Sequence, residues 1–129
     1  MLKKRQRQKV KVGNKLSHAE RGERLAAAPT PDAYIPVAEG VNIAADIYGE
    51  KGPLVLLQHG GGQTRHAWKS AGSQLAAAGY RAVSLDARGH GDSDWAPDGD
   101  YSNEALVADL VAVVQHFDQK PILVGASMG

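Results

Sequence analysis

The sequence predicts an α/β fold in which a mostly parallel sheet, with an N-terminal antiparallel hairpin, is flanked by helices. Three runs rich in apolar residues have the length of strands, at residues 54–57, 80–85 and 122–124. Such runs are typical of strands that are buried on both faces of a parallel sheet. Segments with helical spacing of apolar residues separate the runs, as right-handed crossovers between parallel strands require.

The hairpin is predicted ahead of the first run. Residues 34–37 and 41–47 alternate between apolar and more polar side chains, as half-exposed strands do. Glu39 and Gly40 suit the turn between these two strands. A loop over residues 49–53 then leads into the first buried strand.

Two helices are predicted between the buried strands. The first ends at Gly79, a residue type that favours helix termination. The second begins at a capping residue, Ser102, and has one apolar face. The apolar positions are Ala67, Ala71, Leu75 and Ala78 in the first helix, and Leu106, Leu110, Val113, Val114 and Phe117 in the second.

The formal net charge of +1 averages two unlike parts of the 129-residue chain. Residues 1–33 carry nine basic and three acidic side chains, whereas residues 34–129 carry six and eleven. We predict that residues 1–33 form a disordered basic tail and that residues 34–129 form a partial α/β domain. Three interpretations of the tail stay open: an extension or over-long start of translation, a nucleic-acid or anionic-surface binding segment, and an organelle-targeting peptide.

Composition excludes several kinds of site. The chain has no cysteine, which excludes a disulfide framework, a thiolate nucleophile and Cys-ligated metal sites. No two histidines have the spacing of a metal site, so we expect neither a metal nor a cofactor. No apolar run approaches the ~20 residues of a membrane helix, and no secretory signal follows the basic start. We therefore expect a cytoplasmic protein without a membrane partner.

Three segments with chemically active side chains follow the three predicted buried strands. They cover residues 59–63, 86–93 and 125–129. In an open α/β sheet, ligands bind beyond the carboxyl ends of the strands. The sequence therefore predicts a functional site at this edge of the sheet.

The last segment has the pattern G-x-S-x-G directly after a strand, with Ser127 between Gly125 and Gly129. In this pattern a sharp turn from strand to helix presents the serine hydroxyl, and the two glycines remove side chains that would collide. The N–H of the next residue, Met128, can bind a developing oxyanion. Ser127 is therefore the candidate nucleophile.

The first segment supplies a second candidate donor. His59, Gly60, Gly61 and Gly62 place flexible backbone beside the predicted nucleophile, and the N–H of Gly61 is the expected oxyanion donor. A phosphate-binding loop would continue with Lys and Ser or Thr, and a dinucleotide-binding loop would space its glycines differently. Neither pattern follows Gly62.

The middle segment is interpreted as structural. It holds Asp86, Arg88, His90, Asp92 and Ser93, which could serve catalysis. A glycine-rich turn held by an Asp–Arg interaction and by side-chain hydrogen bonds to the backbone explains the same residues more simply.

Together, these segments resemble motifs of the α/β-hydrolase fold family, in the family's order and over residues 34–129. Residues 59–62, with Trp68 downstream, resemble the oxyanion loop and first helix. Residues 85–93 resemble the loop after the next strand, which recurs in esterase, haloperoxidase-like and epoxide-hydrolase-like members. Residues 125–129 resemble the nucleophile elbow. Epoxide hydrolases and haloalkane dehalogenases carry Asp at the elbow, so Ser127 indicates the serine-dependent, acyl-transfer branch.

The resemblance implies a serine hydrolase that acts on a small ester or related carbonyl substrate through an acyl-enzyme. In this family the triad acid and histidine follow the nucleophile along the chain. Only Met128 and Gly129 follow Ser127, and His90 and His116 precede it. We therefore expect an N-terminal fragment that ends at the elbow and is inactive alone.

Three alternatives stay open. The chain could be a non-catalytic module whose basic tail binds nucleic acid, although the tail has no aromatic residues for base stacking. It could be a haloperoxidase-like or epoxide-hydrolase-like member of the same fold. A partner chain could also supply the second half of the fold.

Overall fold

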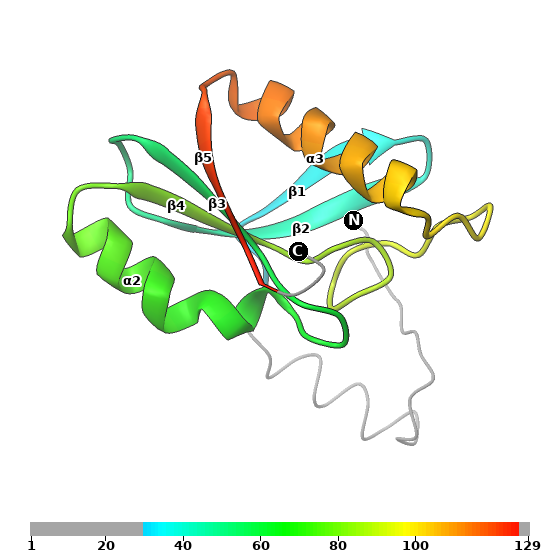
Figure 1. Cartoon of the computed structure of the whole chain (residues 1–129), viewed down its shortest axis with the longest axis horizontal. Helices are drawn as coiled ribbons and strands as arrows, with labels where there is room; N and C mark the ends of the chain where they lie inside the picture. The colour runs from blue at the N-terminus through cyan, green and yellow to red at the C-terminus, as the bar shows by residue number, and fades with distance from the viewer. Residues whose placement is uncertain (1–29, 127–129) are drawn as a thin grey trace. The chain divides into compact units, whose positions relative to one another are not determined.

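The computed structural model describes residues 30–126, so the predicted tail lies outside the described residues up to position 29. The described chain forms one five-stranded sheet with helices on both faces (Figure 1). Its strands are β1 (Ala33–Ala38), β2 (Val41–Tyr48), β3 (Leu54–Gln58), β4 (Arg81–Leu85) and β5 (Pro121–Gly125). Its helices are the 3₁₀ helix η1 (Arg65–Trp68) and the α-helices α2 (Lys69–Ala77) and α3 (Asn103–Phe117).

The sheet has the order β1-β2-β4-β3-β5. β1 and β2 form the expected antiparallel hairpin, and β3 runs parallel to both β4 and β5. β2 joins the two parts by pairing antiparallel with β4. The chain steps from β3 to β4 in one direction and then back across β3 to β5. Both crossovers are right-handed but run in opposite directions along the sheet, so α2 and α3 lie on opposite faces. A change of direction of this kind opens a crevice at the carboxyl ends of the strands.

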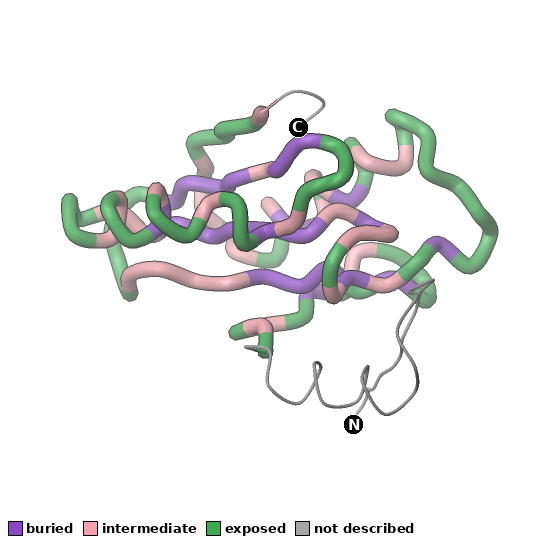
Figure 2. The backbone as a smooth tube through the Cα atoms, turned by 90° about the horizontal axis from the view of Figure 1, so that it is seen from below, coloured by how far each residue is buried: buried purple, intermediate pink, exposed green. Residues whose placement is uncertain are grey.

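Alternate residues of β3 fill two separate cores. Leu54 and Leu56 point to the face covered by α3, where they join the larger cluster of buried side chains. Val55 and Leu57 point to the opposite face and pack near Trp68 and Leu75 of the η1–α2 segment. Figure 2 shows the buried stretches of the backbone concentrated in the strands between the helices. The prediction that residues 54–57 form a strand buried on both faces is confirmed.

The helix ends follow the sequence signals. The Ser102 side chain accepts a hydrogen bond from the N–H of Ala105, which caps the start of α3. Leu110, Val113, Val114 and Phe117 of α3 pack against the core, as predicted. α2 ends at Ala77 with Ala78 as its C-cap, and Gly79 follows with a φ of +96°.

Residues 122–124 form a strand, as predicted, but this strand is not buried on both faces in the part of the chain that the structure describes. These residues do form β5, but Ile122 and Leu123 are 50% and 56% exposed. β5 pairs only with β3 and therefore lies at the edge of the sheet, where no described element covers its outer side. Ile122 and Val124 line an open apolar groove of about 510 Å³ beside α2.

Candidate active site

The three predicted segments meet at one edge of the sheet. Gln58, the last residue of β3, pairs with Leu85 of β4 and with Gly125 of β5. The Ala126 N–H then donates to the Gln58 carbonyl over 3.2 Å, so the chain after β5 runs beside the start of the glycine loop. Residues 59, 86 and 126 directly follow three adjacent strands and therefore begin at the same edge of the sheet.

Residues 60–63 form a tight turn. The Gln63 N–H donates to the Gly60 carbonyl over 3.1 Å, and the Gln63 side chain accepts from the Gly60 N–H over 3.0 Å. Gly62 has a φ of +78°, the left-handed conformation that the third residue of a type II turn requires. The loop is thus held by its own hydrogen bonds, whereas the sequence predicted a flexible backbone here.

The buried ring of His59 fixes the first peptide of this turn. Its Nδ1 lies 2.7 Å from the Gly60 carbonyl, and its Nε2 accepts from the Ala87 N–H over 3.0 Å. The Gly60 carbonyl and the Gly61 N–H belong to one trans peptide, so they point in opposite directions. Holding the carbonyl therefore sets the direction of the Gly61 N–H. This N–H donates to no group among residues 30–126, and Gly61 itself is exposed.

A second ring, His90, reaches the same turn from the loop after β4. Its Nε2 accepts from the Gly62 N–H over 3.4 Å, and its Nδ1 lies 3.1 Å from the Arg88 carbonyl. The centroids of the two imidazole rings are 5.0 Å apart. All four ring nitrogens therefore face backbone groups, and neither histidine offers a free nitrogen to a substrate.

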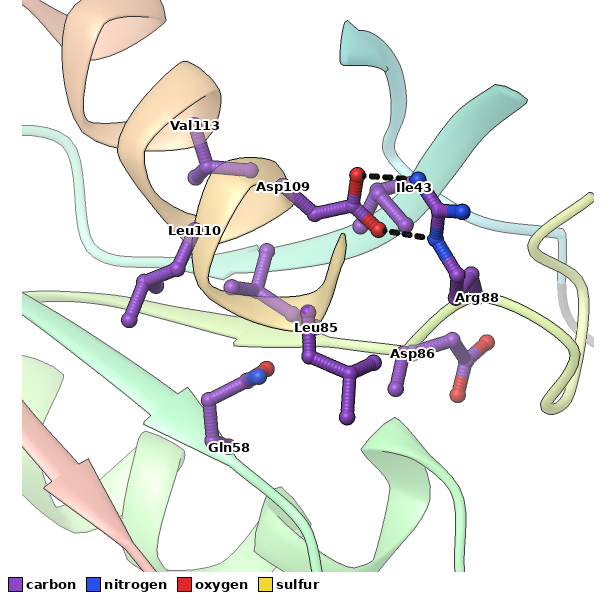
Figure 3. A pocket seen from close by; sticks show the side chains of 10 residues that line it. Ile43, Gln58, Leu85, Asp86, Arg88, Asp109, Leu110 and Val113 are labelled. Atoms are coloured by element: carbon purple, nitrogen blue, oxygen red, sulfur yellow. Dashed lines mark hydrogen bonds and ion pairs between the residues drawn. The ribbon is translucent and has the colours of Figure 1, made fainter. Parts of the chain in front are cut away.

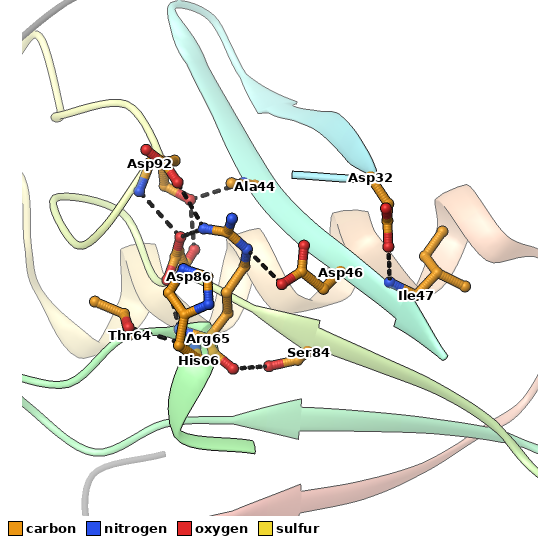
Figure 4. Close-up of polar contacts among 11 residues, drawn as sticks. Asp32, Ala44, Asp46, Ile47, Thr64, Arg65, His66, Ser84, Asp86 and Asp92 are labelled. Atoms are coloured by element: carbon orange, nitrogen blue, oxygen red, sulfur yellow. Dashed lines mark hydrogen bonds and ion pairs between the residues drawn. The ribbon is translucent and has the colours of Figure 1, made fainter. Parts of the chain in front are cut away.

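The loop after β4 folds around the carboxylate of Asp86, which is completely buried. Asp86 accepts from the Arg65 backbone N–H and from Arg65 Nη1, both over 2.6 Å, and from the Asp92 N–H over 3.0 Å (Figure 4). Gly91 passes so close to this carboxylate that a Cβ there would collide with it. The loop is therefore shaped by one buried acid.

Arg65 is the counter-charge of this loop and is itself fully buried. Asp92 lies 2.8 Å from Nη1, and Asp46 of β2 lies 3.0 Å from Nε. Burial by itself lowers the pKa of the Arg65 guanidinium, but Asp86, Asp92 and Asp46 more than offset this effect and raise it above its ordinary value. Arg65 thus stays charged and joins β2, η1 and the loop after β4.

The remaining polar residues of this loop also make structural contacts. The Ser93 hydroxyl donates to the Asp86 carbonyl over 2.6 Å and accepts from the Ala44 N–H over 2.8 Å. Arg88 pairs with both carboxylate oxygens of Asp109 on α3, at 2.6 and 2.7 Å, beside a small pocket (Figure 3). These contacts support the structural interpretation of the segment. Arg65 pairs with acids of β2 and of the loop after β4, and Arg88 pairs with an acid of α3. The sequence did not indicate these pairings.

The structure describes five of the eight predicted site residues: His59, Gly60, Gly61, Gly62 and Gly125. Ser127, Met128 and Gly129 lie outside the described residues. Three further residues, Gln63, Arg65 and His90, hold the site together without having been predicted to do so. Gln63 could have been recognised as the closing residue of a glycine turn. Nothing in the spacing of Arg65 distinguishes a buried arginine from a solvated one.

Two negative findings apply to residues 30–126. No group of three or more His, Asp or Glu side chains is arranged to hold a metal ion there. Within the same range, every helix is too short or too polar to cross a membrane.

Comparison with known proteins agrees with the fold of residues 30–126. The family model for the α/β hydrolase fold matches residues 53–129. The chain belongs to the α/β hydrolase fold family. A probable protein phosphatase methylesterase of Caenorhabditis elegans is 35% identical over 98 residues, which is 68% of this chain and 27% of that protein.

Solved structures of this family superpose on the described fold. The thioesterase domain from the curacin biosynthetic pathway has a TM-score of 0.71 and 33% identity, over 79% of this chain and 38% of that one. An epoxide hydrolase from Vigna radiata has a TM-score of 0.69 and 30% identity, over 75% and 32%. This α/β hydrolase chain thus spans between about a quarter and two fifths of the length of these relatives.

Proposed function

We propose that this chain carries the nucleophile and the oxyanion donors of a serine hydrolase that acts on esters or related carbonyl compounds. Ser127 is the nucleophile, and the N–H groups of Gly61 and Met128 bind the oxyanion. The observation that supports this proposal is the Gly61 N–H, which is fixed in direction and engaged by no described group, in the loop that follows Gln58, the residue bonded to Ala126. Hydrogen-bond donors placed in advance stabilise the developing charge without reorganisation.

In the proposed reaction, Ser127 Oγ attacks the carbonyl carbon while a general base takes its proton. The carbonyl electron pair moves onto the oxygen, where the two N–H groups stabilise it. Collapse of this intermediate expels the alcohol, which takes the proton from the base, and leaves an acyl group on Ser127. Water activated by the same base then attacks the acyl carbon, and the acid product leaves.

Ser127 favours acyl transfer over epoxide opening. The relatives include proteins named as esterases, a thioesterase and epoxide hydrolases, so likeness alone does not select between these reactions. A serine ester is the intermediate of acyl transfer, and two N–H donors suit the tetrahedral oxyanion that forms with it. The proposed substrates are therefore small molecules with an ester or related carbonyl group.

We also propose that residues 1–129 do not complete a catalytic cycle by themselves. His59 and His90 use both ring nitrogens for backbone groups, so neither is available as the base. His66 is an exposed residue of η1, and His116 lies on the exposed side of α3. Loss of the base in serine hydrolases costs on the order of 10⁴–10⁶ in rate.

The test uses p-nitrophenyl acetate and follows two readouts. Because deacylation also needs the base, we expect slow acetylation of Ser127, detected by mass spectrometry, without sustained Ser127-dependent turnover. Gly61→Pro removes the N–H at a turn position that proline favours, and should slow acetylation about a hundredfold. Gly61→Ala keeps the N–H and is the matched control.

Ser127→Ala must abolish the acetylation. An acetyl group found on other residues only, or equal rates for Gly61→Pro and Gly61→Ala, would contradict the proposed nucleophile or the proposed donor. Sustained turnover that disappears in Ser127→Ala would contradict the proposal that the chain is inactive alone.

A further inference from the structure

The imidazole of His90 is held on a rigid base and points at the glycine turn. The Arg88 carbonyl faces its Nδ1 at 3.1 Å, and the Arg88 side chain is anchored to α3 through both oxygens of Asp109. The ring therefore extends from a fixed point in the loop after β4 to the Gly62 N–H. No step of the proposed reaction uses this histidine.

The hydrogen bonds allow only one protonation state for His90. A backbone N–H can only donate, so Nε2 must accept from Gly62 and carry no hydrogen. A carbonyl can only accept, so Nδ1 must carry the hydrogen and donate it to Arg88. The same reasoning gives His59 a hydrogen on Nδ1 and none on Nε2. Both rings are therefore neutral in this arrangement.

This state of His90 selects one orientation of the peptide between Gly61 and Gly62. A type II turn can rotate this peptide by about half a turn, which exchanges the places of the Gly61 carbonyl and the Gly62 N–H. The lone pair on Nε2 attracts the N–H and would repel the carbonyl. The bond is the longest of the four that the two rings make, at 3.4 Å, so its contribution is modest.

We propose that His90 is a positioning residue of the oxyanion loop. His59 and Gln63 fix the peptide that carries the Gly61 N–H, and the bare Nε2 of His90 fixes the peptide after it. The two rings thus orient both the peptide that carries the oxyanion donor and the peptide that follows it. The effect on reaction rate rests on the proposed function, whereas the protonation state and the peptide orientation do not.

Nuclear magnetic resonance of the ¹⁵N-labelled chain tests the protonation state directly. Two-bond correlations between ring protons and ring nitrogens distinguish a protonated nitrogen from a bare one. We expect protonated Nδ1 and bare Nε2 for both His59 and His90. A hydrogen on Nε2 of His90, or rapid exchange between the two neutral forms, would overturn the proposal.

Two matched variants test the acceptor. His90→Gln can place an amide oxygen near the position of Nε2, whereas His90→Asn retains a donor only near the position of Nδ1. We expect His90→Asn to speed hydrogen exchange of the Gly62 amide about threefold to tenfold, and His90→Gln to change it less than about twofold. His66→Asn, at an exposed histidine of η1, is the control and should change nothing.

The acetylation rate of Ser127 by p-nitrophenyl acetate connects this role to the reaction. We expect the same order of effects: acetylation of Ser127 is slower in His90→Asn than in the parent chain, and close to the parent rate in His90→Gln. Equal amide exchange in both variants and the parent chain would overturn the positioning role. If the parent chain is not acetylated at Ser127, the proposed function fails, and the ring and amide measurements still decide the role of His90.

Discussion

β3 and β5 lie side by side in the sheet, run in the same direction and carry similar apolar sequences, yet their environments are opposite. Leu56 of β3 pairs directly with Leu123 of β5. Leu56 is 0% exposed, whereas Leu123 is 56% exposed. β3 has a strand on each side and a helix over each face, while β5 has a single neighbouring strand.

The difference shows that burial comes from neighbours in space. An apolar run predicts a strand, because β-branched and other apolar side chains suit a pleated surface. Whether that strand is central or at an edge depends on which elements pair with it. For β5 the sequence predicted the strand, and its exposure follows from its place at the edge of the described sheet.

The largest expected effect is on the free energy of unfolding, when the paired residues of β3 and β5 are each replaced by alanine. Leu56→Ala should lower the free energy of unfolding by about 2–5 kcal/mol, because it leaves a cavity in the core under α3. Leu123→Ala, at the directly paired position, should cost less than about 1 kcal/mol, since water already reaches that side chain. Urea denaturation of the two variants measures both values, and similar costs would break the comparison.

A smaller effect is expected in the turn that follows β3. Gly62→Ala places a side chain at a φ of +78°, which costs about 1–2 kcal/mol of unfolding free energy. A Cβ at Gly62 would contact nothing within 4 Å, so the cost is one of backbone strain alone. Gly61→Ala is the control, because Gly61 does not have a positive φ. Equal midpoints in urea for the two variants would argue against the turn.

The smallest effect on stability, and a distinct effect on association, is expected at the edge strand. Leu123→Lys should change the unfolding free energy by less than about 0.5 kcal/mol, because the side chain is largely exposed. A charge on an edge strand opposes pairing between chains, so sedimentation velocity should show less self-association. Val111→Lys, at an exposed position of α3, is the control. An equal loss of self-association in both variants would contradict the assignment of the associating surface to β5.

Local signals predicted most of the fold. The apolar runs identified β3 and β4, Ser102 marked the start of α3, and Gly79 marked the end of the first helix region. Each of these signals acts within a few residues of the element that it specifies. The antiparallel pairing of β2 with β4 joins residues that are 34 to 40 positions apart, and no local signal predicts it.

The edge of the sheet at which the three segments begin was predictable, whereas the contacts that support the described loops were not. The strand ends located the glycine loop and the segment after β5 at one edge, and the pairing of Gln58 with Gly125 is consistent with this. The contacts of His59 with Ala87 and of Arg65 with Asp86 join side chains and loops that are far apart in the sequence. Such contacts depend on how the loops pack, which the spacing of residues does not encode.

The charge centre at Arg65 also has an evolutionary consequence. Asp46, Asp86 and Asp92 all pair with a single guanidinium, so a neutral side chain at position 65 alone would leave the buried carboxylate of Asp86 without a counter-charge. Apolar groups of matching shape can replace a whole buried ion network at little cost, but only when all partners change together. We therefore expect the four positions to change together, because substitutions that are harmful one by one become acceptable in combination.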